Sequence, residues 1–220
     1  MSKSKKNILN SEILKKGILR LTLNNPENKN ALSTQMMDSL ISAIKNASVN
    51  NEVRVIVIAS KGDTFCSGHD LKEIQEITED EEHKELNLHN LFNLCSSLMQ
   101  LIVQSPKPVI AEVAGIATAA GCQLVASCDL AISSESAKFA TPGVNIGLFC
   151  STPMVALSRN ISKKNSMKML LTGDMISADE AKRISLINDC VPDDQLTKSV
   201  LDLAKKISEK SQAVLKIGKE

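Results

Sequence analysis

The chain has 220 residues, with 26 Lys and Arg against 25 Asp and Glu and a formal net charge of +1. Single domains commonly hold about 100–200 residues, so one sizeable domain is expected rather than two independent ones. The balanced charge, the absence of Trp and Tyr and the presence of only four Phe residues argue against a nucleic-acid-binding module, which needs basic and aromatic surfaces.

The distribution of apolar residues and cysteines indicates where the protein resides. No stretch approaches the roughly 20 apolar residues that cross a bilayer, so no membrane insertion is expected. Six cysteines lie in apolar or turn segments without a Cys-x-x-Cys pair, which predicts reduced, mostly buried thiols. Residues 1–6 are basic but show neither a signal core nor a transit-peptide pattern. A cytoplasmic location is therefore predicted, with the mitochondrial matrix as the alternative.

Apolar periodicity predicts alternating strands and helices along the chain. The first half is expected to hold a strand at 17–23, a helix at 33–47 capped by Ser33, a strand at 54–59, a helical stretch from 70, an acidic loop at 79–82 and a long helix at 86–103. The second half is expected to hold a strand at 109–113, a helix beginning near 121, a strand at 130–133 and helices at 152–160, 163–171, 177–184, 194–209 and 211–220. This order predicts an α/β fold with crossover connections.

Glycine is concentrated at the ends of predicted strands. Six of the nine glycines fall between residues 62 and 147, and two sites, 65–73 and 115–123, place small residues between a strand and a helix. Backbone amides in such turns can point at a developing negative charge. One turn of this kind usually reflects close backbone packing, whereas two facing turns would form an oxyanion hole.

Colinear motifs covering nearly the whole chain carry a resemblance to a known family. They lie at residues 25–33, 65–73, 107–115, 120–123, 128–131, 139–142 and 171–173. On these motifs the chain resembles the crotonase (enoyl-CoA hydratase/isomerase) superfamily, and segments 117–129 and 139–153 are similar to one branch of it. The resemblance implies an α/β fold built as a spiral of ββα turns, with two near-perpendicular sheets and a helical C-terminal region.

The resemblance also implies a domain organisation, a ligand and an assembly. Residues 1–190 would form the crotonase spiral core, and residues 191–220 the start of the C-terminal helical region, incomplete relative to the family. The implied ligand is an acyl-CoA thioester, with coenzyme A as part of the substrate and no separate cofactor. A homotrimer or a dimer of trimers is implied, weakened if the C-terminal segment is missing. No metal site is expected, because His83 and His89 fall on different faces of a helix.

The resemblance assigns binding roles to particular positions. In the family two backbone amides hold the thioester oxygen, and by position these are the amides of His69 and Ala120. The His69 side chain is then structural or contacts the ligand, rather than acting as a base. Lys72 matches a lysine beside the CoA phosphate and adenosine, and Lys29 and Ala31 fall where the family shapes the adenine pocket. The alternative for each lysine is an ordinary surface side chain.

The family's hydratases use two glutamates for general acid–base catalysis, and both positions are substituted in this sequence. The resemblance places the first at Gln123 and the second at Gly143. An amide cannot act as a carboxylate base, and glycine has no side chain. Candidate substitutes are Asn145, Cys150, Ser151 and Thr152. The alternative is that Ser151 or Thr152 caps a helix and Cys150 fills space.

The prediction is therefore a crotonase-family enzyme of acyl-CoA or lipid metabolism, a lyase or isomerase that stabilises a thioester enolate. Standard two-glutamate hydratase activity is expected to be weak or absent. The alternative is a non-catalytic acyl-CoA binder or an oligomerising partner.

Overall fold

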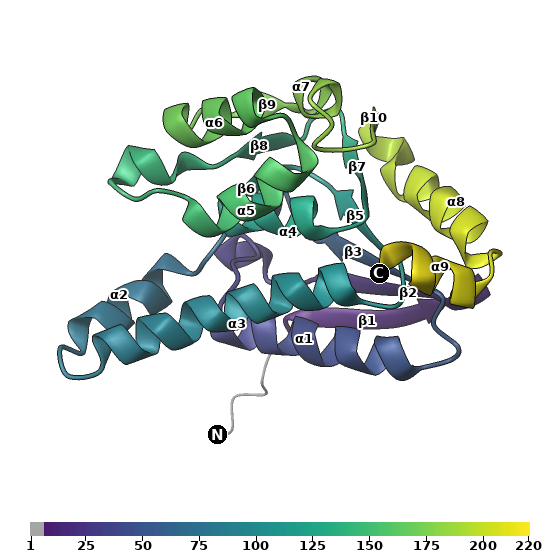
Figure 1. The fold of residues 1–220 in the computed structure, drawn as a ribbon, viewed down its shortest axis with the longest axis horizontal. Helices are drawn as coiled ribbons and strands as arrows, with labels where there is room; N and C mark the ends of the chain where they lie inside the picture. Colours follow the sequence, from purple (N-terminus) through teal and green to yellow (C-terminus); the bar gives the residue numbers. More distant parts are fainter. Residues whose placement is uncertain (1–6) are drawn as a thin grey trace.

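The computed structural model describes residues 7–220, so the basic start at residues 1–6 lies outside the described residues. A six-stranded sheet runs through the centre, and a smaller four-stranded sheet lies beside it (Figure 1). The large sheet has the order β1 (Leu9–Leu14), β2 (Ile18–Leu23), β3 (Val55–Ser60), β5 (Val109–Val113), β7 (Leu130–Ser134) and β10 (Asp189–Val191). The small sheet has the order β4 (Thr64–Cys66), β6 (Ile116–Thr118), β8 (Lys138–Ala140) and β9 (Ile176–Ser177).

Most neighbouring strands are parallel, as crossover connections require. The exceptions are β1 with β2 and β8 with β9, which are antiparallel. The expected α/β fold with two sheets is confirmed. Several strands were not predicted, because β4, β6, β8, β9 and β10 have only two or three residues each and are too short to show a period.

The helices follow the predicted order closely. They are α1 (Thr34–Val49), α2 (Leu71–Glu79), α3 (Lys84–Gln104), α4 (Ala120–Ser127), α5 (Ser151–Asn160), α6 (Lys163–Thr172), α7 (Ala178–Arg183), α8 (Leu196–Ser208) and α9 (Gln212–Lys219). The predicted cap is confirmed for α1, where the Ser33 side chain accepts a hydrogen bond from the backbone N–H of Met36. No helix within residues 7–220 is long and apolar enough to pass through a membrane.

Both faces of the large sheet are buried. Along β3, Val55 and Val57 belong to an apolar cluster with Val200 of α8, whereas Ile56 and Ile58 belong to the main core with α1, α3 and α4. This explains why β3 is a continuous apolar run rather than an alternating one. Helix α8 thus covers one face of the sheet, and the helices that carry the candidate site lie on the other.

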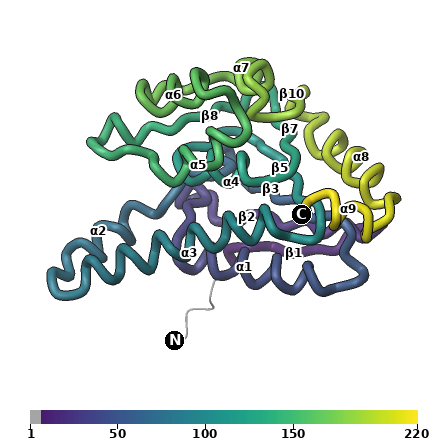
Figure 2. Tube along the Cα trace, viewed as in Figure 1, coloured from purple at the N-terminus to yellow at the C-terminus, as the bar shows by residue number. Residues whose placement is uncertain are grey.

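Helix α9 lies beside the end of α3, as the trace in Figure 2 shows. The ammonium of Lys219 pairs with the Asp129 carboxylate at 2.5 Å and donates to the backbone carbonyl of Lys107 at 3.2 Å. The proposed division between residues 1–190 and 191–220 stays a prediction.

Candidate functional site

The two small-residue turns lie against each other at the ends of adjacent strands. Strands β4 and β6 are parallel neighbours, with Cys66 opposite Ala117, and each is followed by a turn and a helix. A Cβ built on Gly68 would lie 3.2 Å from the backbone nitrogen of Ala120, and one on Gly121 would lie 2.1 Å from the carbonyl oxygen of Cys66. Only glycine allows backbones to approach this closely. The fold therefore brings the two predicted turns together.

The backbone at Ala119 sets the direction of the second turn. Ala119 has φ +50° and ψ −121°, a conformation that costs a non-glycine residue on the order of 1–3 kcal/mol. It is followed at once by Ala120, the first residue of α4, whose N–H is among those left free at a helix start. No loop or cap hydrogen bond among residues 7–220 uses the N–H of Ala120 or of His69. Both donors are thus available, and their role in binding a thioester stays a prediction.

The imidazole of His69 packs against α3 rather than facing solvent. Its ring meets that of Phe92 edge to face, with the centroids 5.2 Å apart and an interplanar angle of 82°. Both ring nitrogens are buried without a hydrogen-bond partner among the described residues. Burial lowers the pKa of His69, and this effect exceeds the opposing influence of the Glu73 carboxylate and the Leu32 carbonyl. The neutral imidazole is therefore favoured.

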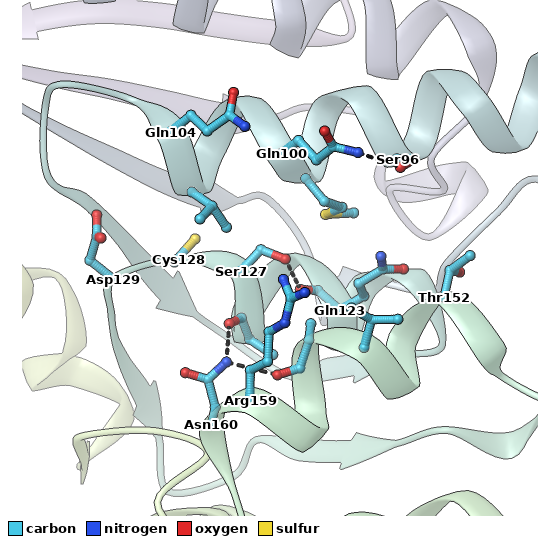
Figure 3. A pocket seen from close by; sticks show the side chains of 15 residues that line it. Ser96, Gln100, Gln104, Gln123, Ser127, Cys128, Asp129, Thr152, Arg159 and Asn160 are labelled. Carbon is cyan, nitrogen blue, oxygen red and sulfur yellow. Dashed lines mark hydrogen bonds between the residues drawn. The ribbon is translucent and has the colours of Figure 1, made fainter. Parts of the chain in front are cut away.

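Gln123 lines a cavity between α3, α4 and α5 (Figure 3). The cavity has a volume of about 720 Å³ and a mixed polar and apolar lining. Gln123 is only 5% exposed, and its side-chain Oε1 has no hydrogen-bond partner among the described residues. Figure 3 shows Gln123 and Thr152 at one end of the cavity, and Asp129 and Gln104 at the other.

Gly143 lies outside the lining of this cavity, in a turn of 3₁₀ helix at Pro142–Ile146. Its backbone N–H donates to the Cys150 Sγ at 3.3 Å. A Cβ at this position would lie 2.8 Å from that sulfur and 2.8 Å from the carbonyl oxygen of Leu148. The structure therefore places Gln123 and Gly143, the two positions that the resemblance assigns to glutamates, in different surroundings: Gln123 lies beside a cavity and Gly143 in a filled turn.

The expectation that Ser151 or Thr152 caps a helix is wrong. Both residues lie inside α5, whose N-cap is Cys150, and the Cys150 side chain makes no cap hydrogen bond. The Thr152 hydroxyl is consequently free of a capping role and lines the same cavity as Gln123.

The three residues predicted to contact coenzyme A lie near the turn that follows β4. The backbone N–H of Ser67 donates to the carbonyl of Lys29 at 3.1 Å, so the loop that holds Lys29 and Ala31 runs beside that turn. Lys72 is exposed in the first turn of α2. The Lys29 ammonium lies 3.4 Å from the Asp63 carboxylate on the surface, a contact of small energetic value. These positions are compatible with phosphate or adenine contacts, which stay predictions.

Asn30 is a positioning residue that the sequence analysis did not single out. It is fully buried, and its side-chain nitrogen donates to the carbonyls of Lys61 at 2.9 Å and Thr64 at 2.7 Å, while its oxygen accepts from the N–H of Asn25. It thereby fixes the loop beside β4. Its position inside a run of polar turn residues gave no sign of burial.

Comparison with known proteins decides the family. The model of the enoyl-CoA hydratase/isomerase family matches residues 14–220. The chain belongs to the enoyl-CoA hydratase/isomerase family. It is 47% identical over 203 residues to the mouse and human proteins named enoyl-CoA hydratase domain-containing protein 3, mitochondrial, which confirms the expected branch. These matches cover 92% of this chain, but the chain spans only 66% of the mouse protein and 65% of the human protein.

Solved structures of family members agree with this fold. The crystal structure of human enoyl-CoA hydratase domain-containing protein 3 matches with a TM-score of 0.91 and 45% identity, covering 97% of this chain and 82% of that one. An enoyl-CoA hydratase from Mycobacterium smegmatis matches with a TM-score of 0.92 and 43% identity, covering 97% and 81%. The curated relatives carry the word mitochondrial in their names, which lends no support to the cytoplasmic prediction and agrees with its alternative.

Proposed function

We propose that this family member binds an acyl-CoA thioester and holds its carbonyl oxygen between the backbone N–H groups of His69 and Ala120. The observation that carries the proposal is the packing of Gly68 against the Ala119–Ala120 peptide, with 3.2 Å from a built Cβ to the Ala120 nitrogen. Two free N–H donors on neighbouring turns would stabilise an oxygen that gains negative charge. In comparable sites the removal of one such donor raises the activation free energy by about 2.7–4 kcal/mol. A thioester enolate fits this requirement.

The same proposal assigns this chain weak or absent standard hydratase activity. Gln123 cannot take a proton from water as a carboxylate does, and Gly143 offers no group at all. General acid–base catalysis typically supplies 10²–10⁴-fold, so a hydratase without either group is slow even when it binds substrate well. The lyase or isomerase reaction would then depend on enolate stabilisation, with solvent water taking up and returning the proton.

Coenzyme A would enter only as part of the substrate. Lys72 would pair with a phosphate, while Lys29 and Ala31 would border the adenine, since all three lie around the first turn. A homotrimer or a dimer of trimers is the proposed assembly. The mitochondrial matrix is the proposed location, on the strength of the relatives' names.

The competing proposal is a non-catalytic acyl-CoA binder or an oligomerising partner. It is favoured by the substitution of both glutamate positions. A steady-state assay with crotonyl-CoA, run beside calorimetry with butyryl-CoA, separates the two. Measurable turnover well below that of a two-carboxylate hydratase supports the enzyme, as does exchange of the α-protons of butyryl-CoA with deuterated water. Binding with neither turnover nor exchange supports the binder. Turnover equal to an ordinary hydratase contradicts the role given to the missing carboxylates, and absence of binding contradicts both proposals.

The coenzyme A contact has its own test. Lys72→Ala should weaken binding of butyryl-CoA and leave binding of butyryl-pantetheine, which lacks the nucleotide, unchanged. Lys198→Ala is the matched control, because this exposed lysine lies on α8 and pairs with Asp202. Equal affinity of butyryl-CoA for the wild type and the Lys72 variant would remove Lys72 from the proposed site.

A further inference from the structure

The cavity between α3, α4 and α5 has one positive charge in its wall that no carboxylate balances. Among the residues that line it, only Asp129 and Arg159 are charged. The Asp129 carboxylate is already paired, because it lies 2.5 Å from the Lys219 ammonium and accepts a hydrogen bond from the N–H of Val109 at 2.7 Å. The Arg159 guanidinium forms no ion pair or hydrogen bond with any residue in the described part of the chain. An anion in the cavity would therefore meet an unpaired cation.

The end of the cavity nearer the proposed thioester position is marked by Gln123 and Thr152 (Figure 3). Gln123 follows Ala120 by three residues in α4, so this end lies about one helical turn, or ~5 Å, beyond the Ala120 N–H. An acyl chain whose thioester oxygen meets the Ala120 N–H can thus enter the cavity at this end.

Arg159 lies farther along the cavity. It follows Thr152 by seven residues in α5, a distance of ~10 Å along the helix axis. The last turn of α5 lies against the end of α4, because the Asn160 side chain donates to the carbonyl of Ala126 at 2.8 Å. Side chains on a helix lean toward its N-terminus, and Figure 3 shows Arg159 extending toward Ser127, between the two ends of the cavity. The guanidinium is therefore placed to meet the distal part of an acyl chain.

The wall around Arg159 suits a charged chain end better than a hydrocarbon one. Gln100, Gln104 and Asn160 add amide groups to the lining. A saturated acyl tail would displace water from the guanidinium and these amides without offering them a hydrogen bond, which costs free energy. A carboxylate instead accepts two parallel hydrogen bonds from a guanidinium, the geometry for which arginine is suited. The distal end of the cavity thus favours a carboxylate.

We propose that the cavity binds coenzyme A monothioesters of dicarboxylic acids, with Arg159 holding the distal carboxylate. Met99 and Val155, which also line the cavity, would contact the methylene groups between the two ends of the chain. The ~10 Å along α5 is of the order spanned by an extended adipyl or suberyl chain. This inference rests on the proposed function, because the thioester oxygen must lie at the N–H groups of His69 and Ala120.

Calorimetry with adipyl-CoA, hexanoyl-CoA and free coenzyme A tests the proposal. Hexanoyl-CoA has as many acyl carbons as adipyl-CoA and lacks the distal carboxylate. Adipyl-CoA should bind about tenfold more tightly than hexanoyl-CoA, as expected for one charged hydrogen-bonded pair, and added NaCl should reduce this difference.

The other outcomes of this titration separate the inference from the function on which it rests. Equal affinities for adipyl-CoA and hexanoyl-CoA overturn the inference and leave acyl-CoA binding in place. Free coenzyme A that binds as tightly as adipyl-CoA also overturns it, since the recognised anion would then be a phosphate of the nucleotide. Failure to bind any of the three overturns the proposed function as well.

Three variants test whether Arg159 carries the preference. Arg159→Met should lower the affinity for adipyl-CoA to that for hexanoyl-CoA, and Arg159→Lys, which keeps the charge without the planar fork, should retain part of the preference. Lys164→Met is the control, because it makes the same change in net charge at an exposed residue of α6 that does not line the cavity. A preference that survives Arg159→Met, or that falls equally in Lys164→Met, overturns the assignment. Loss of hexanoyl-CoA binding in Arg159→Met also overturns it, since Arg159 would then support the cavity rather than bind the carboxylate.

Discussion

The sulfur of Cys150 fills the space into which a side chain at Gly143 would extend. The Gly143 N–H donates to this sulfur at 3.3 Å, and a Cβ on Gly143 would lie 2.8 Å from both the sulfur and the Leu148 carbonyl oxygen. The resemblance assigns the second family glutamate to position 143, and the turn at 143–150 leaves no room for a side chain there. The turn at 143–150 in this shape therefore requires glycine at position 143.

Gly143→Glu should therefore destabilise the fold without restoring hydratase chemistry. Because the Leu148 oxygen is backbone and cannot swing away, we expect a loss of about 1–3 kcal/mol in the free energy of unfolding, measured in urea. Gly218→Ala is the matched control, since a Cβ there meets no atom within 4 Å and helix α9 should gain up to about 1 kcal/mol. A Gly143→Glu protein as stable as the wild type would show that the turn opens readily.

Ala119→Gly should stabilise the protein, although glycine usually weakens a fold. The backbone at φ +50° and ψ −121° is strained for alanine and free of strain for glycine. After allowance for the greater entropy of glycine in the unfolded chain, we expect a net gain of about 0.5–1.5 kcal/mol. Ala126→Gly, inside the same helix α4, should instead lose about 1 kcal/mol. Thermal and urea unfolding measure whether the two variants change stability in opposite directions. A lower free energy of unfolding for Ala119→Gly than for the wild type would contradict the strain argument.

The sequence predicted the long elements because their apolar residues repeat over many positions. Helix α1 begins at its predicted cap, Ser33, and β3 lies within one residue of its expected range at both ends. The short strands β4 and β6, which set the two site turns side by side, have three residues each and show no such repeat. Their pairing depends on contacts between segments about fifty residues apart, which local periodicity does not contain.

The candidate site was predictable only in part for the same reason. The turns at His69 and Ala120 carry a local signal, small residues between a strand and a helix, and the resemblance supplied their order. The contact between Gly143 and Cys150 arises from the shape of a loop, and the burial of Asn30 arises from carbonyls on another segment. Neither has a local sequence signature.

Asn30→Ala should be strongly destabilising despite its place in a polar turn. The substitution removes the hydrogen bonds to the buried carbonyl of Thr64 and to the partly buried carbonyl of Lys61, and it places alanine at φ +50°. The unpaired buried carbonyl costs about 1–3 kcal/mol and the backbone strain of alanine on the order of 1 kcal/mol, so we expect a total of about 2–4 kcal/mol by urea unfolding. Asn30→Gly should lose less stability than Asn30→Ala, because glycine adopts φ +50° without strain. Asn28→Ala, at an exposed neighbour with one long hydrogen bond of 3.5 Å, should change stability by less than about 0.5 kcal/mol.

The stability of the protein should fall as the pH drops, partly through His69. Burial lowers the pKa of this imidazole below its ordinary value of 6.5, so the unfolded chain binds a proton more readily than the folded protein does. The free energy of unfolding rises with pH wherever the unfolded state binds more protons than the folded state. The contribution of His69 to stability is therefore complete above about pH 7.5, and it is lost as the pH falls through 6.5 toward the pKa of the folded state. His69→Gln, which keeps the backbone N–H and removes the titrating ring, should show a smaller fall in the free energy of unfolding between pH 7.5 and pH 5. Urea titrations at half-unit intervals measure both curves. Parallel curves for the two proteins would mean that the imidazole accepts its proton as easily in the folded state as in the unfolded chain.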